Sequence, residues 1–361
     1  MASDSPGNIK ASKIILPIVI GLAIVGWMLY RDVDNDVLDN FTFTWHSYMF
    51  IALACLFMVG RDLGYIIRIR LLSRGSLSWK QAFRVIMLWE FTSAITPSAV
   101  GGTSVATVFI HKEGLSVGKS ASIVMLTAFF DELYLCLLFP VLIFAVGVHE
   151  IFGLHFGHEL MWFAYIGFGL KFLLLAALTY GLFIKPKGLK WLITSVFRLP
   201  FLRRWKTGAE KAGDDIILSS GEIKKYSPGF WFKAFAATFL SWTSRFLVVN
   251  ALFMAFFTFK DHLLLLGRQL VMWIMMVVAP TPGGSGIAEI IFKNFLGDIM
   301  PVGMATQAGT AVMIAIMWRL ITYYPYLAIG AIIVPRWFDR SFKVRRKSKK
   351  DSPNTGVDQS L

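Results

Sequence analysis

The chain has 361 residues, of which 56% are apolar and only 16% charged, and its mean hydropathy is +0.62. This composition excludes an ordinary soluble globular domain and indicates a membrane protein with several spans. The net charge of +14 would also suit a protein that binds nucleic acid. However, the cations gather between apolar segments, so we expect lipid headgroups, and no nucleic acid, as their partners.

Apolar stretches long enough to cross about 30 Å of hydrocarbon as helices recur along the chain. Six are uninterrupted, over residues 13–30, 45–67, 119–147, 160–184, 231–257 and 303–334. Two more, over 79–110 and 263–297, contain a helix-breaking Thr-Pro dipeptide. We therefore expect an all-α integral membrane protein with about six full spans and two broken, re-entrant hairpins.

The two interrupted segments indicate a duplicated unit. Each has a Thr-Pro dipeptide followed by clustered glycines, namely Thr96, Pro97, Gly101 and Gly102 in the first, and Thr281, Pro282, Gly283, Gly284 and Gly286 in the second. Arg61 lies 36 residues before Pro97, and Arg245 lies 37 residues before Pro282. If each broken segment enters and leaves on one side, each half crosses three times, so the second half is inverted.

The expected organisation follows from these segments. We predict an N-terminal tail over 1–12, a first repeat over 13–147, a second repeat over 160–335, and a basic, disordered tail over 336–361. Residues 185–229 are too polar to span and are expected to lie in the membrane interface.

Loop charges predict the orientation. With the N-terminus in the cytoplasm, only 4 of the 36 Lys and Arg residues fall outside and 4 fall within spans. This is a strong positive-inside pattern, and it places both termini in the cytoplasm of a cell (inner) membrane. The basic loop and tail would then face anionic lipids at the cytoplasmic surface.

Ionisable residues within spans are costly and are therefore candidates for function. They are Arg61, Asp62, Glu90, Asp131, Glu132, Arg245, Glu289 and Arg319. A guanidinium offers a planar, bidentate match to phosphate, so the repeat-related Arg61 and Arg245 suit a phospholipid headgroup. Alternatively, the arginines pair with the acids and only hold the halves together. The four acids Asp62, Glu90, Asp131 and Glu132 would balance charge in the empty site.

The broken segments offer further binding groups. Glycines permit close backbone approach, and a helix that starts after them directs free N–H groups toward an anion, with Thr96 and Thr281 adding hydroxyls. Simple helix packing is the alternative explanation for such glycines. No nucleotide, serine-nucleophile or metal-ligand motif is apparent, so we expect no cofactor, no metal and no enzymatic activity.

The second motif, Pro282-Gly283-Gly284-Ser285-Gly286-Ile287-Ala288-Glu289, followed by Arg319, resembles a flippase-like family signature. That family is typified by the transmembrane region of lysylphosphatidylglycerol synthase, and the resemblance covers about residues 13–335. It implies a membrane domain that moves a lipid, in the best-known members an aminoacylated phosphatidylglycerol, between leaflets. The synthases add a soluble aminoacyl-transferase domain that this sequence lacks, so we do not expect it to make the lipid.

We therefore expect a lipid translocase, with a phospholipid substrate, whose broken hairpins, Arg61 and Arg245 line a polar cavity. Arg319 would pair with an acid of a hairpin. One alternative is an integral-membrane enzyme acting on a lipid-linked phosphate, with Asp131 and Glu132 as base or metal ligands. Another is a non-transporting scaffold for envelope assembly. The chain could also form a homo-oligomer.

Overall fold

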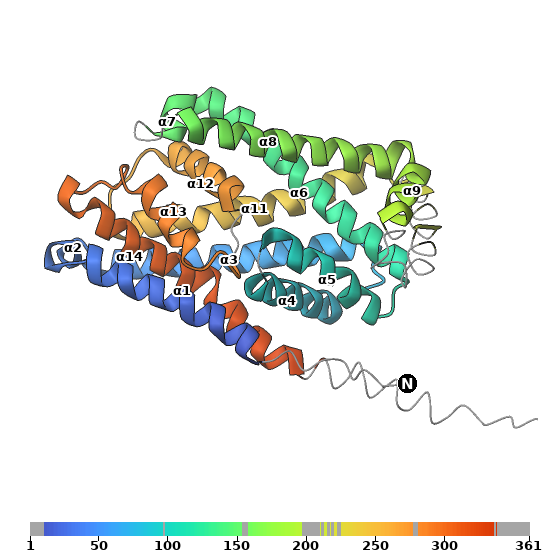
Figure 1. Ribbon diagram of the computed structural model, residues 1–361, viewed down its shortest axis with the longest axis horizontal. Helices are drawn as coiled ribbons and strands as arrows, with labels where there is room; N and C mark the ends of the chain where they lie inside the picture. Colours follow the sequence, from blue (N-terminus) through green and yellow to red (C-terminus); the bar gives the residue numbers. More distant parts are fainter. Residues whose placement is uncertain are drawn as a thin grey trace, which may run out of the picture.

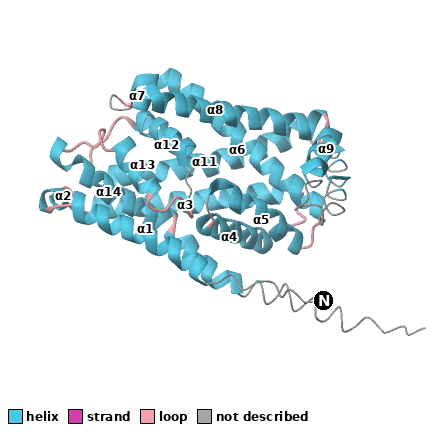
Figure 2. Ribbon diagram, in the orientation of Figure 1, coloured by secondary structure: helices cyan, strands magenta, loops and turns pink. Residues whose placement is uncertain are grey.

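The computed structural model describes residues 11–96, 98–153, 158–196, parts of 210–221, 225–276, 281–335 and 337. Within these residues the chain is helical and forms no β-strand (Figure 2). Five helices are long and apolar enough to cross a membrane: Trp45–Leu72, Val117–Val146, Ala164–Ile184, Pro228–Phe256 and Met304–Pro335. The all-α, multi-pass expectation is therefore confirmed, whereas the count of six full spans stays a prediction.

The helices follow one another in an order that repeats. In the first half they are α1 (Ala11–Asp32), α2 (Asn35–Asp39), α3 (Trp45–Leu72), α4 (Trp79–Ile95), α5 (Ser98–Lys112), α6 (Val117–Val146) and α7 (Val148–Phe152). In the second half they are α8 (His158–Thr179), the π-helical η1 (Tyr180–Ile184), α9 (Pro186–Val196), α11 (Pro228–Phe256), α12 (His262–Met276), α13 (Ile287–Leu296) and α14 (Met304–Thr322). Both α3 to α6 and α11 to α14 run in the order of a long helix, two shorter helices and a longer helix.

Local sequence explains where several of these helices start. Ser78 and Gln81 form a reciprocal capping box at the start of α4. Ser116 and Ser227 accept hydrogen bonds from first-turn N–H groups of α6 and α11, and Pro228 suits the first position of α11.

Helices α3 and α11 pack against each other along the middle of the molecule (Figure 1). A Cβ on Gly60 would lie 3.2 Å from the Ser244 hydroxyl oxygen, and one on Gly64 would lie 2.3 Å from that of Ser241. Because the numbering rises along α3 as it falls along α11, the two helices are antiparallel. Small side chains at this crossing let the backbones approach closely, as is common between membrane helices.

The outer helices exchange partners between the halves. Helix α1, at the start of the first half, packs on α14, and α8, at the start of the second half, packs on α6. In Figure 1, α4 and α5 lie toward the right end of the central pair, whereas α12 and α13 lie toward the left end. The two broken hairpins therefore approach the middle from opposite ends.

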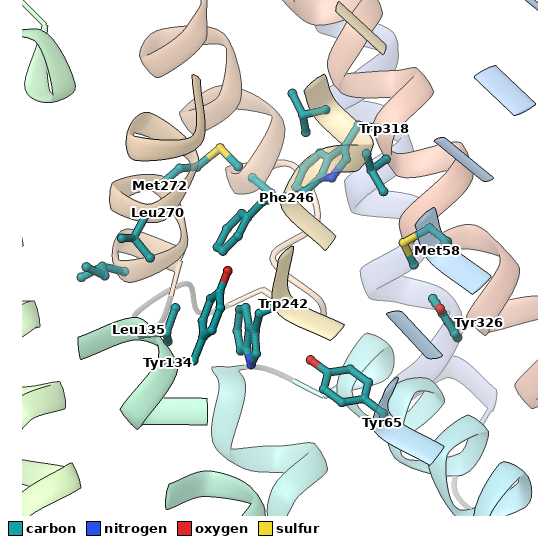
Figure 3. Packing of buried hydrophobic residues seen from close by; sticks show 14 of the residues in the cluster. Met58, Tyr65, Tyr134, Leu135, Trp242, Phe246, Leu270, Met272, Trp318 and Tyr326 are labelled. Carbon is teal, nitrogen blue, oxygen red and sulfur yellow. The ribbon is translucent and has the colours of Figure 1, made fainter. Parts of the chain in front are cut away.

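The buried core between these helices is rich in aromatic side chains. Figure 3 shows Tyr134 of α6, Trp242 of α11 and Tyr65 of α3 among them. Tyr134 stacks on Trp242 with ring centroids 6.1 Å apart, and its hydroxyl hydrogen-bonds Thr243 at 2.9 Å. These rings surround the polar site rather than filling it.

The remaining predicted segments are only partly described. Within 185–229, α9 forms a short amphipathic helix with Trp191 exposed, and Lys190 forms an ion pair with Asp214. The tail at 1–10 and nearly all of 336–361 lie outside the described residues, as does Pro97.

Candidate functional site

The two broken hairpins meet at their breaks. The Gly283 N–H donates to the Thr96 carbonyl across 3.3 Å, and the Tyr323 hydroxyl donates to the Ala94 carbonyl across 3.1 Å. Backbone groups freed by a break need partners inside a membrane protein. Here each half supplies partners for the other, so the two Thr-Pro motifs form one joint.

The glycines of the second motif are required by backbone shape. Gly283, Gly284 and Gly286 have φ angles of 57°, 67° and 82°, a region that strongly favours glycine. A Cβ on Gly283 would lie 2.4 Å from the Tyr323 ring and 2.8 Å from the Ala94 carbonyl oxygen. In the first motif, Gly102 instead lets α5 approach Ser93 of α4.

Arg319 holds the second hairpin in this shape. Its Nε donates to Glu289 at 2.8 Å, and its Nη2 donates to the carbonyls of Gly283 and Gly284 at 3.1 and 3.2 Å. The expected pairing of Arg319 with a hairpin acid is therefore present. Thr281 Oγ1 and Glu289 Oε2 are buried without a hydrogen-bond partner.

Arg61 is buried at the centre of an ionic cluster. One terminal nitrogen donates to Asp62 at 2.9 Å and to the Tyr326 hydroxyl at 2.8 Å, and the other contacts Glu90 at 2.6 Å. The Tyr326 hydroxyl in turn donates to Asp62 at 2.8 Å. Both terminal nitrogens of Arg61 are thus engaged with protein groups.

Arg245 lies near this cluster but in a different environment. Its guanidinium stacks over Trp273, 4.1 Å from the ring centroid, and lies 5.6 Å from Trp242. Among the described residues it forms no ion pair within 4.0 Å. Among the described residues it is therefore a cation held by aromatic rings and by a hydrogen bond to the Tyr65 side chain, without a direct ion pair.

Two further ion pairs lie on α6. Asp131 binds Arg68 at 2.5 Å and accepts from the Trp242 indole at 2.7 Å, and Glu132 binds Lys171 of α8 at 3.0 Å. Neighbouring residues on a helix diverge by about 100°, which explains why the two acids reach different cations. No group of three or more His, Cys, Asp or Glu suited to a metal ion occurs in the described residues.

These groups line two adjoining cavities. The larger, of about 520 Å³, lies between α3, α4, α6, α8, α11 and α12, and its lining includes Arg68, Asp131, Glu132 and Lys171. The smaller, of about 130 Å³, lies at the joint of the hairpins, and its lining includes Thr96, Gly283, Gly284 and Arg319. Glu90, Ser93, Arg245 and Trp273 line both cavities. Arg245 thus stands where the two spaces meet.

The model of the lysylphosphatidylglycerol synthase TM region matches residues 14–330. The chain belongs to this family. It is also 27% identical over 303 residues to a UPF0104 membrane protein of Archaeoglobus fulgidus, covering 80% of this chain and 86% of that protein. No solved structure gives a significant match. Membership implies a membrane, lipid-related role.

The predicted site residues of this family member gather at one place. Arg61, Arg245, Thr96, Gly102, Thr281, Pro282, Gly283, Gly284, Gly286, Glu289 and Arg319 belong to the cluster, the joint or the hairpins beside it. Gly101 lies within α5, and Pro97 is outside the described residues. Each of the four charge-balancing acids is in an ion pair.

Sequence reasoning missed Arg68. It is not among the predicted site residues, yet its side chain is only 3% exposed and pairs with Asp131 at the larger cavity. It lies seven residues after Arg61, on the same helix face, and this spacing was the signal available. The aromatic partners of Arg245 carried no comparable sequence signal.

Proposed function

We propose that this protein is a lipid translocase that moves a phospholipid, with or without an aminoacyl group, or another lipid-linked phosphate between leaflets. The observation that supports this proposal most strongly is the position of Arg245. This cation has no ion-pair partner among the described residues and lies where two cavities meet. A charge inside a membrane protein is expensive unless it is paired or has a ligand. An anionic headgroup supplies that missing partner.

Phosphate recognition by Arg245 is supported by its surroundings. Trp273 holds the guanidinium by stacking on it, and one N–H group hydrogen-bonds the Tyr65 side chain, so the remaining N–H groups can contact phosphate oxygens. Ser93 lines the smaller cavity beside it and can add a hydroxyl donor, whereas the Thr96 hydroxyl in that lining donates to the Thr92 carbonyl at 2.6 Å. Arg61 and Arg319 are occupied by protein partners, so their proposed role is to hold the site in shape.

The apolar part of the larger cavity suits the lipid body. Helix α8 supplies Ile166, Leu170 and Leu174 to its lining, and Ile166 and Leu170 are also 60% and 61% exposed on the outside of the protein. One helix face therefore borders both the cavity and the surrounding hydrocarbon. A headgroup can occupy the polar end while its tails remain in lipid, which avoids the cost of dragging a charge through hydrocarbon.

We further propose that the two halves are inverted repeats that rock against each other. The antiparallel α3 and α11, with hairpins entering from opposite ends, support this architecture, and inverted repeats with broken helices near the midplane are common in transporters. The proposed location is a cell (inner) membrane with both termini cytoplasmic, where basic segments face anionic lipids. A homo-oligomer is compatible with this arrangement, and we propose no enzymatic activity.

The test is headgroup translocation of labelled phospholipids in proteoliposomes. Arg245→Gln should abolish transport, whereas Arg31→Gln, at a half-exposed position at the end of α1, should leave it unchanged. Both variants must first elute as monodisperse protein.

Transport by Arg245→Gln at the wild-type rate would exclude the phosphate role. If the intact protein moves neither phospholipids nor polyprenyl-linked phosphates, the translocase proposal is wrong. Metal-dependent product formation would then favour the enzyme alternative, and loss of envelope integrity only on loop substitution would favour a scaffold.

A further inference from the structure

The charges around Arg61 balance only if Arg245 is counted. One guanidinium, on Arg61, faces two carboxylates, on Asp62 and Glu90, so this cluster alone carries one excess negative charge. Arg245 supplies the compensating positive charge without contacting either acid. The other ion pairs that line the cavities, including Arg68 with Asp131, are each neutral by themselves. The empty site is therefore neutral as a whole.

Glu90 is the acid placed to respond when that balance changes. It lines both cavities together with Arg245, whereas Asp62 lines neither and is held by both Arg61 and the Tyr326 hydroxyl. The titratable and charged groups that surround Glu90 are Arg61, Asp62, Tyr65 and Arg68 from α3, Asp131 and Glu132 from α6, Lys171 from α8, Arg245 from α11, and Arg319, Tyr323 and Tyr326 from α14 and the helical turns after it.

An anionic headgroup disturbs this neutrality. When a phosphodiester with one negative charge binds Arg245, the phosphate neutralises the positive charge of Arg245. The site then carries one excess negative charge, which lies on Glu90. Such a charge is unfavourable in a site that excludes most water. One proton bound by Glu90 restores neutrality, and the protonated carboxyl still accepts from Arg61 while its O–H can donate to a phosphate oxygen.

We propose that Glu90 takes up one proton from water when the cavity binds an anionic phospholipid, so that translocation of such a lipid is coupled to proton movement. This inference rests on the proposed function and adds a co-substrate to it. The step forms one O–H bond at the Glu90 carboxylate and involves no redox change. A zwitterionic headgroup carries its own cation and needs no proton.

The test is calorimetric titration of the purified full chain in detergent, in buffers that differ in ionisation enthalpy. Short-chain phosphatidylglycerol should bind with uptake of about one proton per lipid, and short-chain phosphatidylethanolamine with none. Glu90→Gln should still bind phosphatidylglycerol but without proton uptake. Glu113→Gln is the matched control, because Glu113 pairs with Arg84 outside both cavities, and its proton uptake should equal that of the wild type.

A second measurement on the wild type keeps the proposal falsifiable if Glu90→Gln does not fold. Infrared difference spectra should show a new protonated-carboxyl band on binding of phosphatidylglycerol and none on binding of phosphatidylethanolamine. Binding without proton uptake, uptake that persists in Glu90→Gln, or binding that requires sodium instead would each overturn the inference and leave the translocase proposal intact. A wild-type protein that binds no phospholipid would overturn both.

Discussion

Arg61 and Arg245 occupy corresponding positions on α3 and α11, yet their surroundings differ. Arg61 is 2% exposed and bound by two carboxylates and a tyrosine hydroxyl, whereas Arg245 rests on two tryptophan rings and has no ion pair among the described residues. Under the proposed function, Arg61 would hold the site in shape and Arg245 would bind the ligand.

The sequence differences that separate the two arginines are few. Relative to the aligned Arg and Thr-Pro positions, Asp62 of the first half corresponds to Phe246 of the second, and Glu90 corresponds to Met275. The second half has neither of these two acids, and its arginine forms no direct ion pair among the described residues. Trp242 and Trp273, at other positions, hold the guanidinium instead.

The comparison depends on the joint between the hairpins, so its disruption should have the largest effect. Gly283→Val would place a β-branched side chain at a φ of 57° and against the Tyr323 ring. Strain and overpacking together should cost at least about 3 kcal/mol. We expect little monodisperse protein by size-exclusion chromatography. Gly303→Ala is the control, because nothing lies near its added Cβ, and a normal elution profile is expected.

Next in size is the direct contrast of the two arginines. Arg61→Leu leaves two partly buried carboxylates without their cation and should cost about 3–5 kcal/mol. Arg245→Leu breaks no direct ion pair and should therefore cost less stability than Arg61→Leu, while it abolishes transport. Thermal unfolding in detergent measures the first difference and the proteoliposome assay the second. Equal destabilisation by both substitutions would contradict the division of roles.

A smaller effect is expected at the wall of the larger cavity. Lys171 joins α8 to Glu132 of α6, and both side chains are nearly buried. In a double-mutant cycle with Lys171→Met and Glu132→Gln, we expect a coupling of about 1–2 kcal/mol in unfolding free energy. Strict additivity would mean that the pair does not hold α8, and that packing alone keeps this wall in place.

The smallest effect is expected outside the cluster. Arg31→Gln removes a half-exposed cation whose partner, Asp32, keeps a second ion pair with Lys293 at 2.6 Å. Solvent screens such exposed pairs strongly. We expect a melting temperature indistinguishable from that of the wild type. A clear decrease in melting temperature would show that cations at the helix ends contribute as much to stability as those of the core.

The sequence predicted the helical class and the charged residues of the cluster, because polar groups within apolar stretches are conspicuous. It also predicted that Arg319 pairs with a hairpin acid, but it did not predict the partners of Arg61 and Arg245, since the sequence alone does not distinguish these two arginines. Partner choice depends on helix rotation and on contacts far apart in sequence, such as Tyr326 with Arg61. Arg68 was missed for the same reason, since a residue near a helix end can face outward or into the cavity.

The exchange of outer helices has a consequence for chain synthesis. Helix α1 is made long before its partners in α13 and α14: Lys293 binds Asp32, and Gly309 packs against the Asp32 backbone. Its packing face must therefore remain against lipid until α13 and α14 are made. Helix α8 meets α6 within a few dozen residues and has no such delay. A truncation that removes α14 should consequently destabilise α1 before the other helices.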